Sequence, residues 1–138
     1  MPPPATRPFR LEVLTGVLAV CRLGPDAPLP DWALSSAFLS ITRTSDELSL
    51  VCPQEVVPPD ARCEKGWRCL RVEGPLEFSE IGVLASLTSV LAAAGVSLFA
   101  LSTFDTDYLL VKEADLQMAA TALEKAGHRV QWPAKADR

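Results

Sequence analysis

The sequence predicts an α+β fold in which two helices cover one face of an antiparallel sheet, and three observations lead to this prediction. Ten of the twelve prolines lie in residues 1–60, so long helices are expected only in the second half of the chain. Two segments of that half place apolar residues at the helical period of 3.6 residues. Short apolar segments typical of strands flank both of them.

The chain begins with strands and irregular connections. Residues 11–23 form an apolar run rich in valine and leucine, which predicts one long strand with Gly16 as a bulge. Residues 24–30 contain three prolines and a glycine and are expected to form a loop. Asp31 is then expected to cap one short turn at 32–34.

Two further strands are expected before the middle of the chain. They lie at residues 37–42 and 48–52, around a turn at 44–46 that contains threonine, serine and aspartate. Residues 53–59, which include three prolines, predict another loop. The first half therefore has little room for a helix.

The second half begins with residues 67–73, which alternate as a strand does and end at a Gly-Pro pair. Ser79 is expected to open a helix that ends before Gly95, a residue suited to the left-handed position after a helix. The apolar side chains of this helix form one stripe. They are Val83, Leu84, Leu87, Val90, Leu91 and Ala94.

A hairpin and a second helix are expected next. Residues 96–104 predict an apolar strand, and a tight turn at 105–106 leads into a strand at 107–111. Glu113 and Asp115 are acids suited to the positive end of the helix that follows. The expected buried stripe of this helix is Leu116, Ala119, Ala120 and Leu123.

The order of the predicted elements identifies the plan of the fold. Gly127 stops the second helix, and residues 128–132 are expected to form a final strand. The resulting order, β-α-β-β-α-β, is the ferredoxin-like plan, with two helices on one face of a four-stranded antiparallel sheet.

The first half is expected to be a shortened copy of this plan, with the strand that starts the second unit also closing the first sheet. A shift of 60 residues places 42–51 over 102–111. The matched pairs are Leu50 with Leu110, Val51 with Val111, and Glu47 with Asp107. We therefore divide the chain into a disordered tail at 1–9, a shortened unit at 10–66 and a complete unit at 67–134.

Charge and composition exclude several classes of function. The net charge is −4, and residues 1–66 and 67–138 each carry −2, which leaves no basic surface for a nucleic acid. The apolar run behind the proline-rich start is interrupted by Glu12, so neither a signal peptide nor a membrane span is expected. We expect a cytoplasmic protein without membrane or nucleic-acid partners.

The cysteines and the single His128 do not predict a metal site or a catalytic site. No two cysteines have the CxxC spacing, so buried free thiols are expected and no metal or other cofactor. The four cysteines are Cys21, Cys52, Cys63 and Cys69. No nucleophile with a base and no phosphate-binding motif occurs, so no catalytic residue is named and the protein is not expected to be an enzyme.

Two segments carry a resemblance to a known family. They are FSEIGVL at 78–84 and STFDTDYLLV at 102–111. Over residues 70–113, about a third of the chain, the sequence is similar to the paired ACT domains of the aspartokinase-regulatory type. It resembles most closely the small bacterial proteins related to the CASTOR arginine sensors.

The resemblance implies a regulatory module that holds a free amino acid at the interface between two ACT units. The implied ligand-binding residues are Glu80, Gly82, Val83 and Leu84 from the first segment, and Thr103, Phe104 and Asp107 from the second. In the sensors the position that matches Asp107 faces a guanidinium group, so arginine or another cationic amino acid is the implied ligand. Ile81 and Thr106 depart from the sensors' residues, and the identity of the amino acid stays open.

The chemistry of these residues agrees with that implication. Residues 80–84 are expected to form the first turn of a helix, whose unpaired N–H groups suit a carboxylate. Gly82 has two interpretations, a ligand in contact with the backbone or a helix packed closely on the sheet. Glu80 either serves the helix dipole or pairs with the ammonium group of the ligand.

The second segment adds the remaining groups that an amino acid needs. Thr103 offers a hydroxyl, Phe104 an apolar wall and Asp107 a negative charge. For Asp105 an ordinary turn is the preferred interpretation, and for Asp107 a ligand role is preferred over a turn.

The alternative function is an interaction module that keeps the fold without a ligand. A homodimer is expected with either function, because association would cover remaining apolar surface.

Overall fold

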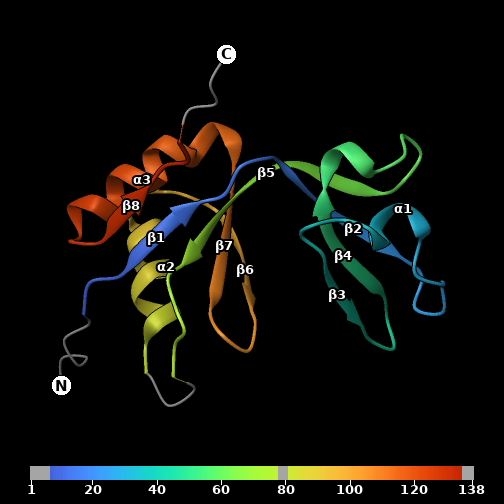
Figure 1. Cartoon of the computed structure of the whole chain (residues 1–138), viewed down its shortest axis with the longest axis horizontal. Coiled ribbons are helices and arrows are strands. Elements are labelled where there is room, and N and C mark those ends of the chain that lie inside the picture. Colours follow the sequence, from blue (N-terminus) through green and yellow to red (C-terminus); the bar gives the residue numbers. More distant parts are fainter. Residues whose placement is uncertain (1–6, 78–80, 135–138) are drawn as a thin grey trace. The chain divides into compact units, whose positions relative to one another are not determined.

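The computed structural model describes residues 7–77 and 81–134, and these fold as two compact units (Figure 1). The larger unit contains residues 7–15 and 68–134, and the smaller unit contains residues 16–67. This division differs from the expected one, because residues 7–15 belong to the larger unit. Phe9, which we expected in a disordered tail, is buried in its core.

The larger unit has a five-stranded sheet in the order β6-β7-β5-β1-β8. Its strands are β1 (Arg10–Val13), the second part of β5 (Cys63–Val72), β6 (Leu98–Ser102), β7 (Asp107–Lys112) and β8 (Arg129–Gln131). Strand β1 runs antiparallel to β5 and parallel to β8, and β6 pairs with β7 as an antiparallel hairpin. The elements from β5 to β8 follow in the predicted order β-α-β-β-α-β.

Two helices, α2 (Val83–Ala93) and α3 (Leu116–Lys125), pack on one face of this sheet. A short 3₁₀ turn, η2 (Glu113–Asp115), leads into α3. Both predicted stripes lie in the core or against it, with Leu87, Leu91 and Leu123 fully buried. The strand residues of this core include Leu11, Val13, Leu70, Val72, Leu109 and Val111.

Glycines end both helices as predicted. Gly95 and Gly127 adopt positive φ angles of 78° and 98°. After α2, the N–H of Val96 donates to Leu91 O at 2.9 Å, and after α3, the N–H of His128 donates to Leu123 O at 3.0 Å. These bonds satisfy carbonyl groups that a helix end would otherwise leave without partners.

The prediction of one long strand over 11–23 is wrong. The segment forms β1 and then β2 (Leu18–Leu23), with Gly16 at a φ of 89° in the connection between them. Strand β1 inserts between β5 and β8, where the four-stranded plan would pair those two strands directly. The larger sheet therefore gains a fifth strand and one parallel pair.

The smaller unit is the shortened copy that we expected. Its elements are β2, α1 (Asp31–Leu34), β3 (Ser40–Arg43), β4 (Leu48–Pro53), the 3₁₀ turn η1 (Gln54–Val56) and the first part of β5. The strand order β3-β4-β2-β5 is the ferredoxin-like order. The second helix is reduced to η1, in a segment where prolines block a longer helix. Asp31 lies within the first turn of α1 and makes no capping hydrogen bond, contrary to its expected role.

The two hairpins match in a register of 59 residues, not 60. The N–H of Thr44 donates to Glu47 O at 2.9 Å, and the N–H of Thr103 donates to Thr106 O at 2.8 Å. The first paired residue after the turn is Leu48 in the first hairpin and Asp107 in the second. The predicted match of Glu47 with Asp107 is therefore wrong by one residue.

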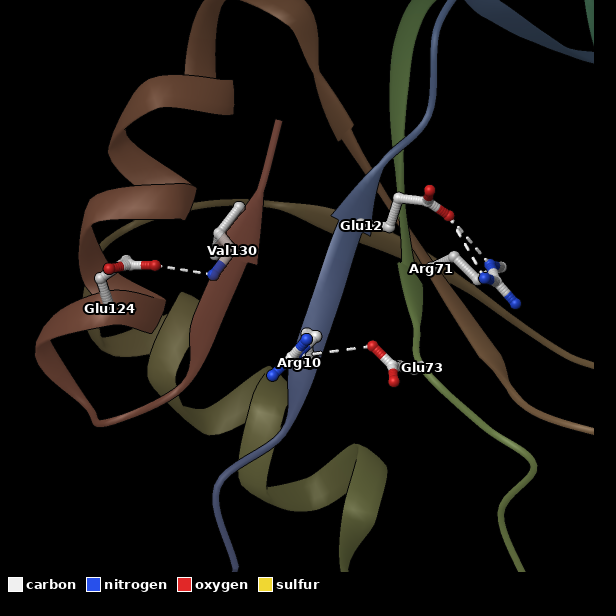
Figure 2. A network of polar contacts seen from close by, with 6 residues as sticks. All are labelled: Arg10, Glu12, Arg71, Glu73, Glu124 and Val130. Carbon is white, nitrogen blue, oxygen red and sulfur yellow. Dashed lines mark hydrogen bonds and ion pairs between the residues drawn. The ribbon is translucent and has the colours of Figure 1, made fainter. Parts of the chain in front are cut away.

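The face of the larger sheet opposite the helices carries charged residues (Figure 2). Arg10 on β1 pairs with Glu73 at 3.6 Å, and Arg71 on β5 pairs with Glu12 at 3.3 Å. Such exposed ion pairs contribute at most about 1 kcal/mol each.

Glu124 of α3 accepts a hydrogen bond from the N–H of Val130 at 2.6 Å. This bond occupies the N–H of Val130, so that this group is not open to pairing with another strand.

The buried ring of His128 fixes the start of β1. Its Nδ1 accepts a hydrogen bond from the N–H of Phe9 at 3.0 Å, so the neutral ring carries its proton on Nε2. The two rings stack with their centroids 5.8 Å apart. Burial lowers the pKa of His128 below its ordinary value of 6.5.

We expect the free energy of unfolding to fall as the pH decreases through 6.5 towards the lowered pKa of His128. The unfolded chain binds a proton on this ring more readily than the folded chain, so stability rises with pH in that window. Protonation also removes the acceptor for Phe9. Urea denaturation between pH 7 and pH 5 measures the effect. The variant His128→Asn does not titrate, and an equally steep decline in this variant would contradict the assignment.

Candidate functional site

A cavity of about 260 Å³ lies in the larger unit, between the segment after β5, the start of α2 and the β6–β7 hairpin. Its lining residues are Leu76, Glu77, Val83, Leu84, Ser102, Thr103, Phe104, Asp105, Thr106 and Asp107. Pockets for drug-sized ligands usually measure about 300–1,000 Å³, so this cavity suits a smaller molecule.

The N-terminus of α2 forms one wall of the cavity. The helix begins at Val83 and not at Ser79, and Ser79 and Glu80 lie outside the described residues. The first intrahelical bond runs from the N–H of Ser86 to Gly82 O at 2.8 Å. Within residues 7–77 and 81–134, the N–H groups of Val83 and Leu84 have no hydrogen-bond acceptor and no side chain caps the helix. These groups and the helix dipole favour an anion in the cavity.

Gly82 is needed for its backbone conformation. It occupies the position before the first helical residue with a φ of 81°. A Cβ atom built on it would meet no atom within 4 Å, so the interpretation that it lets α2 pack closely on the sheet is wrong. The glycine at a close approach is Gly74, where a Cβ atom would lie 3.0 Å from Asp105 O and 3.2 Å from Thr106 Cβ.

We expect Gly82→Ala to lower the free energy of unfolding by about 1–2 kcal/mol, because an alanine is strained in the left-handed region. Gly24→Ala is the matched control, since Gly24 has no such φ and an equally open surrounding. Chemical denaturation of the two variants measures the difference. Equal stability of the two variants would contradict the backbone explanation.

Hydrogen bonds hold the β6–β7 turn in one conformation. The hydroxyl of Thr103 donates to Thr106 O at 3.1 Å and accepts from the N–H of Thr106 at 3.3 Å. The buried hydroxyl of Thr106 donates to Val72 O at 2.6 Å, and the N–H of Leu76 donates to Asp105 O at 2.7 Å. The hydroxyl of Thr103, which we expected to meet a ligand, is thus engaged within the turn.

Asp107 stands at the first position of β7, opposite Ser102 on β6. Its carboxylate is half-buried, and Oδ1 accepts a hydrogen bond from the hydroxyl of Ser102 at 2.5 Å. Among the described residues, Oδ2 has no donor. The carboxylate is therefore oriented by its neighbour and retains one oxygen for a ligand.

The charges around the cavity have one sign. Glu77, Asp105 and Asp107 contribute three carboxylates, and the lining residues include no lysine or arginine. Phe104 projects its ring at the rim with 79% of its surface exposed. A cavity with carboxylates on one side and helix N–H groups on another is suited to a ligand that carries both signs of charge.

Five of the seven predicted residues line this one cavity, namely Val83, Leu84, Thr103, Phe104 and Asp107. Gly82 precedes the first of them but does not line it, and Glu80 lies outside the described residues. The sequence interpretation missed Leu76, Glu77, Ser102, Asp105 and Thr106. For Leu76 and Glu77 the sequence contained one signal, the Gly-Pro pair after β5. This pair directs the chain past the hairpin turn.

In the smaller unit, an arginine side chain crosses the region that corresponds to the cavity of the larger unit. Arg43, at the strand end that matches Ser102, donates from Nη2 to Ala27 O at 2.8 Å and from Nη1 to Pro25 O. Its guanidinium group ties the β3 end to the loop before α1. In the larger unit the same region is open and ends in the carboxylate of Asp107.

Two other classes of site find no support in the part of the chain that the structure describes. It contains no group of three or more histidine, cysteine or acidic side chains arranged to hold a metal ion. No helix in this part has the length and apolar character to cross a membrane.

These features define a class of paired, ferredoxin-like units with a cavity at the start of a helix. The chain belongs to the ACT-domain family. A family model described as an ACT domain matches residues 62–125, and a model for an N-terminal domain matches residues 16–60. The crystal structure of Atu0741 from Agobacterium tumefaciens is 38% identical, with a TM-score of 0.89, and covers 96% of this chain and 99% of its own.

Two further proteins are similar to this chain, one in sequence and one in fold. The "Cytosolic arginine sensor for mTORC1 subunit 1" of Rattus norvegicus is 38% identical over 106 residues, which are 74% of this chain and 31% of the sensor. This chain thus spans about a third of the length of that relative. The regulatory subunit of aspartate kinase from Thermus thermophilus shares the fold, with 14% identity, a TM-score of 0.57 and coverage of 82% and 98% of the two chains.

Proposed function

We propose that this chain is a regulatory module and that the cavity of its larger unit binds one free amino acid with a cationic side chain. The observation that carries the proposal is the pairing of open helix N–H groups with the carboxylate of Asp107 in one cavity. The first suits the ligand's carboxylate, and the second suits a cation.

The charges suggest an orientation for the ligand. Its carboxylate would accept hydrogen bonds from the N–H groups of Val83 and Leu84 at the start of α2. Its cationic side chain would meet the free oxygen of Asp107, and Glu77 and Asp105 provide further negative charge for the ammonium group. The name of the arginine sensors supports a cationic amino acid as the class of ligand.

Binding would link two elements that are held separately. The start of α2 belongs to a helix, and Asp107 belongs to the hairpin that Thr106 anchors to β5. A ligand that contacts both would favour the conformation in which they are close, which is the requirement for a regulatory switch. A catalytic role is not part of this proposal.

The proposal extends to the surroundings of the site. We propose that a second ACT unit covers the exposed rim at Phe104, that the chain forms a homodimer, and that it acts in the cytoplasm. Support comes from the exposure of this ring beside the cavity and from the regulatory and cytosolic relatives. The alternative, an interaction module without a ligand, predicts bulky side chains in this space, whereas the structure has a cavity there.

A thermal-shift screen of the full chain against the common amino acids tests the proposal. We expect arginine or lysine at millimolar concentration to raise the melting temperature, because a ligand that binds only the folded state stabilises it by mass action. Agmatine, which lacks the carboxylate, is the control and should have a smaller effect. If no amino acid shifts the transition, the sensor function is contradicted.

A further inference from the structure

Three thiols meet on one face of the smaller sheet, and the proposed function does not use them. Cys21 lies on β2, Cys52 on β4 and Cys63 on β5, and all three are free cysteines that pack in or against the same core. Burial raises the pKa of Cys21 to about 12, and the neighbouring thiols of Cys52 and Cys63 contribute to that rise. Cys21 therefore lies near both Cys52 and Cys63.

The strand register distinguishes these two neighbours. Cys21 and Cys63 are direct partners in the antiparallel pair of β2 and β5. The N–H of Arg22 donates to Arg62 O at 3.0 Å, one residue beyond the cysteine pair, which makes it a non-hydrogen-bonded pair. In such pairs the Cα atoms lie about 4.5 Å apart, within the range of about 4.4–6.8 Å that disulfides require.

Cys52 is placed less favourably for a bond with Cys21. Its direct partner on β2 is Ala19, so Cys21 meets Cys52 diagonally across the strand pair. Diagonal neighbours are typically about 7–8 Å apart, at or beyond the limit at which two cysteines can be joined without moving the backbone.

We propose that Cys21 and Cys63 are a redox modification site that forms a cross-strand disulfide when it reacts with a low-molecular-weight disulfide such as oxidised glutathione. The thiolate of Cys63 attacks one sulfur of the oxidant, which forms a mixed disulfide and releases one thiolate. Cys21 then attacks Cys63 Sγ, loses its proton to solvent and expels the second thiolate. Two protein thiols are oxidised and one disulfide is reduced to two thiols.

Exposure sets the order of these steps. Cys63 is half-buried and can meet an oxidant, whereas Cys21 is only 1% exposed. The bond would join β2 to β5 and enclose β3 and β4 in one covalent loop, which restricts the unfolded chain. Oxidation is therefore expected to raise the melting temperature of the smaller unit. The site contains no lining residue of the amino-acid cavity, so it is independent of the proposed function.

The test is incubation of the full chain with oxidised glutathione, followed by intact mass measurement and peptide mapping without reduction. We expect a mass loss of about 2 Da and one cross-linked peptide pair that contains Cys21 and Cys63. Cys63→Ser should abolish this loss, whereas Cys52→Ala and Cys69→Ala should retain it. Circular dichroism confirms that each variant is folded.

Three results would overturn the proposal. They are a wild-type protein that keeps both thiols, a glutathione adduct on Cys63 that is never released, and a cross-linked peptide that contains Cys52. Peptide mapping of the wild-type protein decides among these even if a variant fails to fold.

Discussion

The variant Asp107→Asn is expected to bind a cationic amino acid 10- to 100-fold more weakly than the unmodified protein. A hydrogen bond to a charged group contributes about 1.5–3 kcal/mol, and the amide keeps the shape of the side chain without its charge. Asparagine also retains an acceptor for the hydroxyl of Ser102, so the hairpin should stay intact. Calorimetric titration with the amino acid that gives the largest thermal shift measures this loss.

Two controls separate the role of Asp107 from a general effect of charge. Asp105→Asn removes a carboxylate of the same cavity, two residues away, and should weaken binding by less. Asp46→Asn removes a carboxylate from the matching turn of the smaller unit and should leave binding unchanged. Equal affinity of Asp107→Asn and the unmodified protein would show that this carboxylate does not contact the ligand.

Leu123→Ala is expected to lower the free energy of unfolding by about 2–5 kcal/mol. Leu123 is fully buried in the core between α3 and the larger sheet, and its truncation removes apolar contacts and leaves a cavity. A loss of this size is a large part of the stability of a small domain. Urea denaturation followed by circular dichroism measures it.

Met118→Ala is the matched control on the same helix, because its side chain is 51% exposed. We expect this variant to change the stability by less than about 1 kcal/mol. If both truncations cost the same free energy, the assignment of the buried face of α3 is wrong.

The helical part of the fold could be predicted from local patterns in the sequence. The stripes of α2 and α3 could be predicted because apolar residues at a spacing of 3.6 fix which side of a helix is buried. Gly95 and Gly127 marked both helix ends because few other residues adopt a positive φ at low cost. The start of α2 was placed four residues too early, because the fold begins the helix after the left-handed Gly82.

Strand partners were harder to predict than strands. The apolar run at 11–23 suggested one strand, but nothing in its local pattern showed that its two ends belong to different units. The place of β1 between β5 and β8 depends on pairing with residues about 60 and 120 positions away. A periodic pattern contains no information of that kind.

The residues of the candidate site could likewise be predicted only in part from the sequence. Val83, Leu84 and Asp107 were named because the two segments that contain them resemble the paired ACT domains, and all three line the cavity. The segment with Leu76 and Glu77 was missed because its place depends on the close approach of Gly74 to the hairpin turn. The register of the two hairpins also depended on turn hydrogen bonds that residue matching could not show.

The most direct test of the amino-acid site is a titration of the isotope-labelled full chain with L-arginine, followed by two-dimensional NMR. The account predicts that the amide resonances of Val83, Leu84 and Asp107 move together with one dissociation constant, while those of the hairpin turn at 44–47 stay in place. Saturable shifts that leave these three residues unchanged and lie elsewhere would contradict it.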